Sequence, residues 1–278
     1  RVRTNRGDSI YHGLNVKVDR RFTQGLLLRA AYTWSKAIDT GSEVFVTSGN
    51  SSMPQNVFDR SGERGLSAFD RRQRFVLTYV YTIPAMPKSD NFALKGVRAL
   101  LSDWQISGTM TLQSGAPETV SDGFDANGDG VGSDRPNLGN PDAPITSYAF
   151  DGAQIGGTPG LLYDGPSFMN SDALVEVSAN DVHWIIPGAT NASNRYGNVG
   201  RNTILTDGTI DSSFSIARSF KLPGREGQQL QFRTELFNPF NHSNLGIPVY
   251  NLIDPDFAGR DITAYGSRQI RFWVKYSF

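Results

Sequence analysis

The carboxy terminus of the chain, residues 268–278 (RQIRFWVKYSF), has an apolar side chain at every second position. These apolar side chains are Ile270, Phe272, Val274, Tyr276 and Phe278. Polar side chains, among them Arg271 and Lys275, lie between them. A period of two predicts a β-strand, and the separation into an apolar and a polar side indicates that the two faces of this strand meet different media.

The amino-acid composition excludes several classes of protein and of binding site. The 278 residues include no cysteine, which excludes disulfides and thiolate metal sites. The net charge is zero, so no bulk field favours nucleic acid, and we expect no nucleic-acid partner. No run of eighteen apolar residues is present, which excludes a transmembrane helix; a membrane β-barrel is not excluded, because only alternate residues of its strands face lipid.

Six further segments repeat the alternation, near residues 10–18, 26–34, 75–83, 104–112, 210–220 and 230–236. Each is about ten residues long, the length that a tilted strand needs to cross a bilayer. A last strand with lipid-side aromatic residues and a terminal phenylalanine is typical of outer-membrane barrels. We therefore predict an all-β fold in the bacterial outer membrane: an antiparallel transmembrane β-barrel, present as a fragment of about seven strands with long external loops.

The connections between these segments alternate in length. Three are short to moderate, at residues 20–25, 84–103 and 222–228, and three are long, at residues 37–72, 114–208 and 238–266. Outer-membrane barrels have short periplasmic turns and long external loops, so the pattern predicts a periplasmic carboxy terminus. The chain opens on RVRTNRGDS without an initiator Met or an export signal. We interpret residues 1–278 as the carboxy-terminal section of a longer barrel protein.

Charge is distributed unequally between the two expected faces. The lipid face carries almost none; Arg218 is the clearest exception, near the periplasmic end of its strand, where a long side chain can snorkel. The opposite face carries charged residues that we expect to line a water-filled lumen: Lys17, Arg29, Arg74, Arg233, Glu235, Arg271 and Lys275. Aromatic residues cluster at strand ends, as in the interfacial girdles of barrels.

A soluble antiparallel β-sandwich also alternates between apolar and polar side chains. Its turn signals would recur every eight to twelve residues, whereas a connection of over ninety residues interrupts the pattern here. The sandwich also requires a dry interior in which the apolar side chains pack together, including Leu28, Leu77, Ile106, Phe232 and Phe272.

Six stretches of the sequence together resemble a known family. They read AYTWSKAID at 31–39, FDRRQRFVLTYVYTIP at 69–84, DWQISGTMTLQSGAP at 103–117, YGNVGRN at 196–202, LQFRTELFNPFNHSN at 230–244 and the closing RQIRFWVKYSF. In this order they are similar to the end of the barrel in TonB-dependent outer-membrane receptors, notably the Oar-like group, whose members often begin with a carboxypeptidase-regulatory-like domain. The resemblance covers most of the chain except parts of the long loop.

This resemblance implies a 22-stranded barrel closed by an amino-terminal plug. Such a barrel imports a scarce nutrient, such as an oligosaccharide or a chelated metal, with energy delivered by TonB through the plug. The implied partners are outer-membrane lipid, TonB, an extracellular small-molecule or oligosaccharide substrate, and the barrel-assembly machinery, which would read the carboxy-terminal signal Phe272, Val274, Tyr276 and Phe278. Seven strands without the rest of the barrel would leave two open edges, so we expect a curved open sheet.

Residues 125–134 (DANGDGVGSD) have the spacing of a calcium-binding loop. The candidate ligands are Asp125, Asn127, Asp129, the carbonyl of Val131 and Asp134. Pro136 occupies the twelfth position, where an EF-hand needs a bidentate Glu, and Asp134 is the available substitute. The alternative is a solvated turn, because Gly, Asn and Asp favour left-handed backbone.

Three other groups have both a functional and a structural interpretation. His12, His183 and His242 lie far apart and lack a metal-ligand spacing. The charged run 70–74 would attract an anionic substrate or lipopolysaccharide phosphate, or pair with loop carboxylates, which we favour. Aromatic residues of the long loop would stack on sugars or, as we expect, form small cores: Phe124, Tyr148, Phe150, Tyr163, Phe168, Trp184 and Tyr196.

Two alternatives to a transport receptor stay open from the sequence. One is a non-transporting outer-membrane surface or adhesion barrel, and the other is a secreted β-sandwich binding module with a calcium-braced loop. We expect no enzyme, because the sequence contains no catalytic signature such as a nucleophile elbow.

Overall fold

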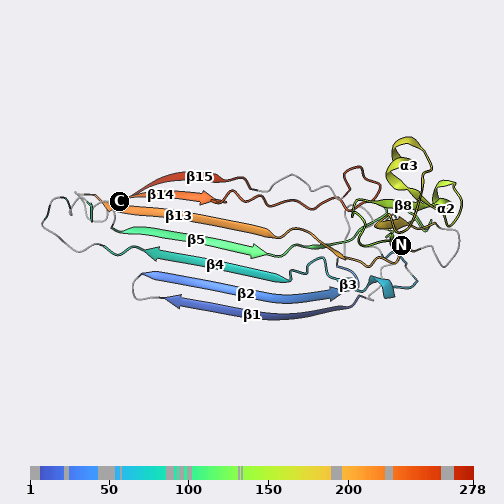
Figure 1. The fold of residues 1–278 in the computed structure, drawn as a ribbon. Helices are drawn as coiled ribbons and strands as arrows, with labels where there is room; N and C mark the ends of the chain where they lie inside the picture. Colours follow the sequence, from blue (N-terminus) through green and yellow to red (C-terminus); the bar gives the residue numbers. More distant parts are fainter. Residues whose placement is uncertain are drawn as a thin grey trace.

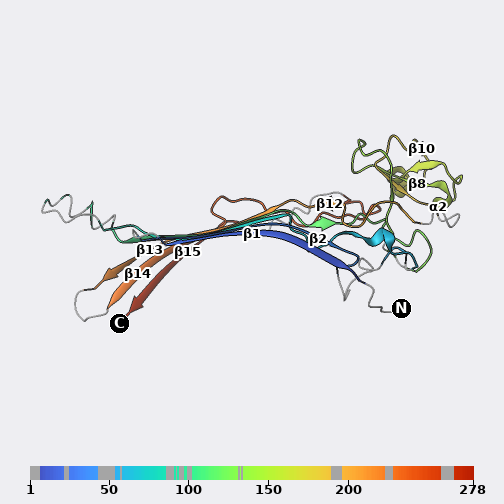
Figure 2. The same ribbon diagram turned by 90° about the horizontal axis from the view of Figure 1, so that it is seen from below.

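The computed structural model of the chain is a long curved sheet with a small folded unit at one end (Figure 1). It describes residues 7–21, 25–42, 54–56, 58–85, 91, 93, 97–98, 102–130, 132, 134–188, 196–222, 228–257 and 266–278. Seen along its edge, the sheet is a single curved layer, and the folded unit lies at the end away from the carboxy terminus (Figure 2).

The main sheet follows the predicted strands. Its path consists of β1 (Ser9–Arg21), β2 (Leu26–Asp39), β4 (Gln73–Thr82), β5 (Trp104–Gln113), β13 (Thr209–Lys221), β14 (Gln229–Phe237) and β15 (Gln269–Ser277). Every neighbouring pair on this path is antiparallel. The short strand β3 (Gly65–Leu66) pairs with the end of β2. The seven predicted strands are confirmed, and consecutive long strands are neighbours in the sheet.

One register places the apolar residues of neighbouring strands opposite one another. One row across five strands consists of Val16, Tyr32, Phe75, Leu112 and Ile210, each paired with the next. Because side chains alternate between faces, a slip of one residue in any pair would move a whole strand's apolar set to the other face. The shared register therefore produces one apolar face and one polar face across the sheet.

Among the residues that the structure describes, no second sheet packs against the apolar face. Phe232 is 44% exposed and Phe272 is 78% exposed, and the described hydrophobic core contains neither of them. That core also lacks Leu28, Leu77 and Ile106 and is drawn entirely from residues 120–257 of the long loops. The sandwich alternative, which needs these side chains together in a dry interior, is therefore wrong.

The main sheet is open at both sides. Among the described strands, β1 pairs only with β2, and β15 pairs only with β14. Both outer strands are exposed along their whole length. Unpaired strand edges invite further pairing, and the single layer curves without closing on itself (Figure 2). The expected curved open sheet is confirmed.

The longest connection folds into a small unit that the sequence did not predict in detail. Its sheet has the order β10 (Glu176–Val177), β9 (Leu162–Asp164), β8 (Tyr148–Asp151), β11 (Trp184–Ile186) and β7 (Asn137–Leu138). The helices α2 (Gly152–Ile155) and α3 (Gly165–Ser171) follow β8 and β9. Two further strands, β6 (Pro117–Glu118) and β12 (Ile204–Leu205), pair at the base of the loop. No helix in the described residues is long and apolar enough to cross a membrane.

Aromatic side chains form the centre of this unit. Phe150 contacts Tyr148 and Phe168 edge to face, with ring centroids 5.9 and 5.5 Å apart. Trp184 is buried and donates its indole N–H to the carbonyl of Ile145 at 2.8 Å. Rings buried in this way are not available to stack on sugars, so the expectation that the loop aromatics form a small core is confirmed for these residues.

A buried ion pair joins the long loop to the shorter loop after β2. Arg135 donates two hydrogen bonds to the Glu63 carboxylate, at 2.9 and 3.1 Å, and both side chains are almost fully buried. Gln55 accepts from the backbone N–H of Arg135 at 2.9 Å and donates to the carbonyl of Gly197 at 3.0 Å. These contacts fix the two long loops against each other.

Arg201 and Asn202, from the YGNVGRN stretch, form a second junction. Arg201 pairs with Asp39 at the end of β2 and donates to the carbonyl of Glu63 at 3.1 Å. Asn202 has a φ of 57°, a left-handed conformation that asparagine tolerates, and its amide donates to the carbonyl of Leu66 at 2.6 Å. These contacts therefore attach the loop unit to the end of β2 and to β3, in addition to the neighbouring loop.

A charge placed on the apolar face tests the assignment of that face to lipid. We expect Leu77→Lys, at the middle of β4, to reduce the stability of the barrel by about 2–4 kcal/mol, the cost of a lysine at the bilayer midplane. Thr78→Lys places the same charge on the polar face and should change the stability by less than about 1 kcal/mol. Denaturant titration of the barrel reconstituted in vesicles measures both, and equal effects of the two variants would contradict the assignment.

Removal of one partner from the buried ion pair tests the junction of the loops. We expect Arg135→Met to reduce the stability of the loop unit by about 3–5 kcal/mol, because the Glu63 carboxylate stays buried without its partner. Protease cleavage of these two loops should accelerate accordingly. Arg29→Gln breaks the exposed pair with Asp19 instead and should cost at most about 1 kcal/mol. Unchanged cleavage in Arg135→Met would show that this pair does not hold the loops.

Candidate functional site

The charged residues expected to line a lumen lie on one face of the sheet. The strand register pairs Arg29 with Thr78 and Glu235 with Arg271. Followed from strand to strand, the register places both pairs on the face of the sheet that carries Lys17. The same face carries the remaining members of the set: Arg74, Arg233 and Lys275. Sequence alternation alone located these residues, because a period of two fixes the face once the strand is known.

Polar contacts connect neighbouring strands across this face. Arg29 forms an ion pair with Asp19 of β1, at 3.1 Å between Nε and Oδ2. Trp273 donates its indole N–H to Glu235 at 2.9 Å, and Arg233 lies 3.5 Å from the same carboxylate. Arg233 and Glu235 thus pair along one strand rather than across two. These side chains are partly exposed, as expected for a face that meets water.

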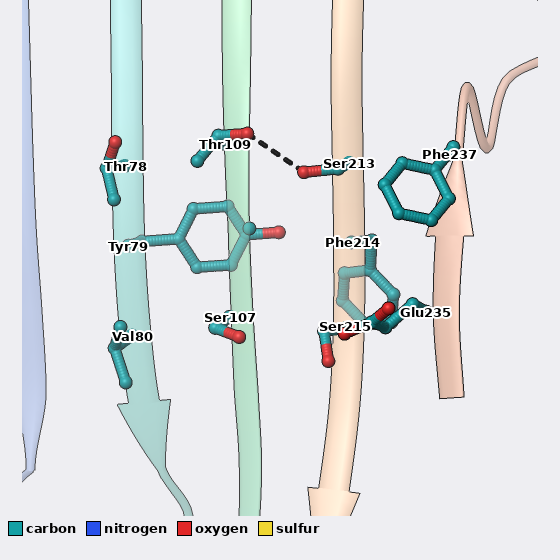
Figure 3. A pocket seen from close by; sticks show the side chains of 11 residues that line it. Thr78, Tyr79, Val80, Ser107, Thr109, Ser213, Phe214, Ser215, Glu235 and Phe237 are labelled. Carbon is teal, nitrogen blue, oxygen red and sulfur yellow. Dashed lines mark hydrogen bonds between the residues drawn. The ribbon is translucent and has the colours of Figure 1, made fainter. Parts of the chain in front are cut away.

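A shallow hollow lies in the middle of the polar face, between β4 and β14 (Figure 3). Small hydroxyl side chains line it: Thr78, Ser107, Thr109, Ser213 and Ser215. Thr109 and Ser213 share a hydrogen bond of 2.8 Å, and Glu235 and Phe237 border the hollow (Figure 3). The hollow exists because these side chains are short. Their hydroxyl groups make its surface able to form hydrogen bonds.

Gly108 lets a tyrosine ring cross the sheet beside this hollow. A Cβ on Gly108 would lie 2.6 Å from the Tyr79 hydroxyl and 2.6 Å from the carbonyl oxygen of Ser213. The Tyr79 ring extends from β4 across β5, as Figure 3 shows. A tyrosine that covers a glycine on the neighbouring strand restores the packing that the missing side chain would supply.

Arg218 is the charged exception on the apolar face. Its guanidinium lies 4.6 Å from the centre of the Phe220 ring and 5.7 Å from that of Trp104, and the residue is only 8% exposed. Cation–π contacts offset part of the cost of desolvating a cation. Trp104 and Arg218 are paired at the end of the sheet where the short connections lie. The position near a strand end is as predicted, and the aromatic rings add a feature that the sequence analysis did not include.

The structure brings together only some of the ligands that the spacing of residues 125–134 predicts for calcium. Asp125 accepts hydrogen bonds from the backbone N–H groups of Asp129 and Gly130, at 2.9 and 2.7 Å, so this carboxylate closes the turn. Asn127 and Asp134 lie together and buried, whereas Asp129 is exposed. Val131 lies outside the described residues.

Asp122 joins Asp134 in this region, although the motif does not include it. Asp122 is fully buried, and its backbone N–H donates to the carbonyl of Asp134 at 2.8 Å. Burial, reinforced by the Asp134 charge, raises the pKa of Asp122 well above its usual range. Burial also raises the pKa of Asp134 to about 6. No sequence pattern pointed to Asp122, because it lies outside the one–three–five spacing.

The charged run before β4 has a largely structural role. Asp70 is buried and accepts from the backbone N–H of Ala37 at 2.7 Å, and Arg72 lies 3.6 Å from its carboxylate. Arg71 donates to the carbonyls of Ala68 and Asp70, at 3.0 and 2.7 Å. The favoured interpretation, pairing with a loop carboxylate, holds for Arg72, whose partner belongs to the run itself.

The three histidines belong to different parts of the structure. His12 is on the outer strand β1, opposite Lys36. The His183 ring contacts the carbonyl of Ala143 at 2.9 Å. His242 lies in the loop after β14. Among the described residues, no group of three His, Cys, Asp or Glu side chains is arranged to hold a metal ion.

The NPFNHSN stretch explains how the chain leaves β14. Asn238 and Asn241 have φ values of 47° and 52°, and the Asn238 amide donates to the carbonyls of His242 and Gly266, at 2.8 and 2.7 Å. The Asn244 side chain bonds both backbone groups of Ile210, at 2.8 and 2.9 Å. Asparagine suits these positions because it tolerates left-handed backbone and carries both a donor and an acceptor.

The expected carboxy-terminal side chains lie on the exposed apolar side of β15, together with Phe278, which directly follows the strand. Phe272, Val274, Tyr276 and Phe278 share this side, and the rings of Tyr276 and Phe278 stack with centroids 5.7 Å apart. The strand lies at the open side of the sheet, where another strand can still be added.

Comparison with known proteins agrees with this geometry. No curated protein and no solved structure matches the chain. A family model described as "Outer membrane beta barrel domain" matches residues 1–271. A match over nearly the whole chain, together with the antiparallel sheet and its two unlike faces, places the protein in the bacterial outer membrane. The chain belongs to the outer membrane beta barrel domain family.

Proposed function

We propose that the chain forms part of the wall and the external surface of a TonB-dependent transport barrel. Its lipid face anchors the wall in the outer membrane, and its polar face borders a water-filled lumen. The external loops take up a scarce nutrient, such as an oligosaccharide or a chelated metal, and a plug moved by TonB admits that nutrient to the lumen. The chain performs no covalent chemistry in this scheme.

The observation that carries this proposal is the polar face, which is continuous from β1 to β15. A row of charged and hydroxyl side chains is expensive to bury in hydrocarbon, so it needs water or protein opposite it. Seven strands form only an open arc, and the diameter of a barrel grows with its strand number. A wide barrel offers the space that this face requires, and a low hydroxyl surface such as the central hollow suits contact with a plug.

Growth on limiting nutrients tests the proposal. A panel of oligosaccharides as sole carbon source and of iron chelates as sole iron source is offered to the wild-type host and to strains that lack this protein or TonB. We expect both deletion strains to lose growth on the same member of the panel. Unchanged growth of the first strain on every member, with reduced surface attachment, would instead support a non-transporting adhesion barrel.

A pair of neighbouring substitutions then locates the transport path. We expect Ser213→Trp, which fills the central hollow on the polar face, to reduce uptake severalfold without lowering the amount of assembled barrel. Phe214→Trp, one residue away on the apolar face, should leave uptake unchanged, because alternate side chains of a strand lie on opposite faces. Equal uptake in the two variants would contradict a path along the polar face.

A further inference from the structure

An acidic pair is buried in the external loops. Asp122 and Asp134 are both fully buried, and a backbone hydrogen bond of 2.8 Å holds them side by side. Within the described part of the chain, neither carboxylate oxygen of Asp122 has a hydrogen-bond partner. We propose that Asp122 and Asp134, with neutral oxygens of the adjoining turn, bind a Ca²⁺ ion.

The electrostatic argument rests on desolvation. An ionised carboxylate loses its hydration when it is buried and needs a cation or several hydrogen-bond donors in compensation. Asp134 has donors, because the backbone N–H and the side-chain amide of Asn127 reach its two oxygens at 2.9 and 2.5 Å. The two carboxylate oxygens of Asp122 have no donor among the described residues, and the negative charge of Asp134 acts on them. A divalent cation between the two carboxylates removes the repulsion and supplies the missing partner for Asp122.

The chemistry of the surrounding oxygens favours calcium. Ca²⁺ accepts six to eight oxygen ligands in irregular geometry, including carbonyl and amide oxygens, whereas Mg²⁺ requires near-octahedral geometry and retains several waters. Among the described residues no three His, Cys, Asp or Glu side chains are arranged to hold a metal ion, so in the proposed site neutral oxygens complete the shell around the two carboxylates. The turn at 125–130 lies beside Asp134 and supplies backbone carbonyls and the Asn127 amide. The proposed ligands therefore differ from those predicted by the spacing of the motif: Asp122 is included, and the exposed Asp129 is not.

The proposed ion would lie where two external loops meet. Ser121, next to Asp122, forms a parallel β-bridge with Asn251 of the loop after β14. The backbone of Ser121 bonds Tyr250 and Leu252 at 2.9 Å each, and Val120 and Leu252 are fully buried in the same core. An ion bound at Asp122 therefore braces the contact between the loops at 114–208 and 238–266.

Protease sensitivity measures this bracing directly. The whole chain is purified in detergent, free of lipopolysaccharide, and treated with protease over a Ca²⁺ titration and, separately, a Mg²⁺ titration. If cleavage requires an opened loop that does not bind the ion, the cleavage rate should fall about tenfold when free Ca²⁺ reaches ten times its dissociation constant. Calorimetric titration with Ca²⁺ should give about one site, with a dissociation constant near 10⁻⁴–10⁻³ M, as in extracellular modules. Mg²⁺ should protect much less.

Matched variants separate the site from other carboxylates. Asp122→Asn should abolish protection by Ca²⁺, whereas Asp142→Asn, at an exposed position of the same loop, should retain it fully. If Asp122→Asn does not fold, chelation of the wild-type protein gives the same test, with faster cleavage expected after the ion is removed. Cleavage of the wild type that is independent of Ca²⁺, or full protection of Asp122→Asn, would overturn the proposal. Protease protection by Ca²⁺ does not depend on uptake, so a failure of this test leaves the proposed transport function untouched.

Discussion

The shared register of the seven long strands is the constraint on which the rest of the structure depends. Backbone hydrogen bonds alone would tolerate a shift of a strand, but a shift of one residue would place charges such as Arg29 in lipid and residues such as Leu77 in water. The need for two unlike faces therefore selects one pairing out of several. The separation of apolar from polar side chains and the position of the loops at the two ends of the sheet follow from that pairing.

The long loops have a different source of stability. Residues of the long connection form a water-excluding core around Phe150 and Trp184, as in a small soluble domain. Two arginines, Arg135 and Arg201, tie this core to the loop after β2 and to the end of β2 itself. The loops at this end of the sheet thus form one folded unit rather than a set of independent loops.

The sequence allowed the strands and their faces to be predicted, because period-two alternation is a local signal. Alternating loop lengths likewise allowed the prediction that the three long connections lie at the same end of the sheet. The sheet inside the long loop was missed, because its strands have two to four residues and one of its pairs, β8 with β11, is parallel and distant in sequence. Asp122 was missed for a related reason: its neighbour Asp134 lies twelve residues away, and only the folded loop brings them together. A motif search finds spacing within a segment, not contacts that folding creates.

The claim that one face meets lipid and the other meets water can be tested most directly on β5. The chain has no cysteine, so Thr109→Cys and Met110→Cys each provide a single attachment point for an environment-sensitive fluorophore. In vesicles with nitroxide-labelled acyl chains, we expect strong quenching of the label at position 110 and little at position 109, because neighbouring residues of a strand lie on opposite faces. Equal quenching at both positions, or quenching at position 110 by aqueous iodide alone, would contradict it.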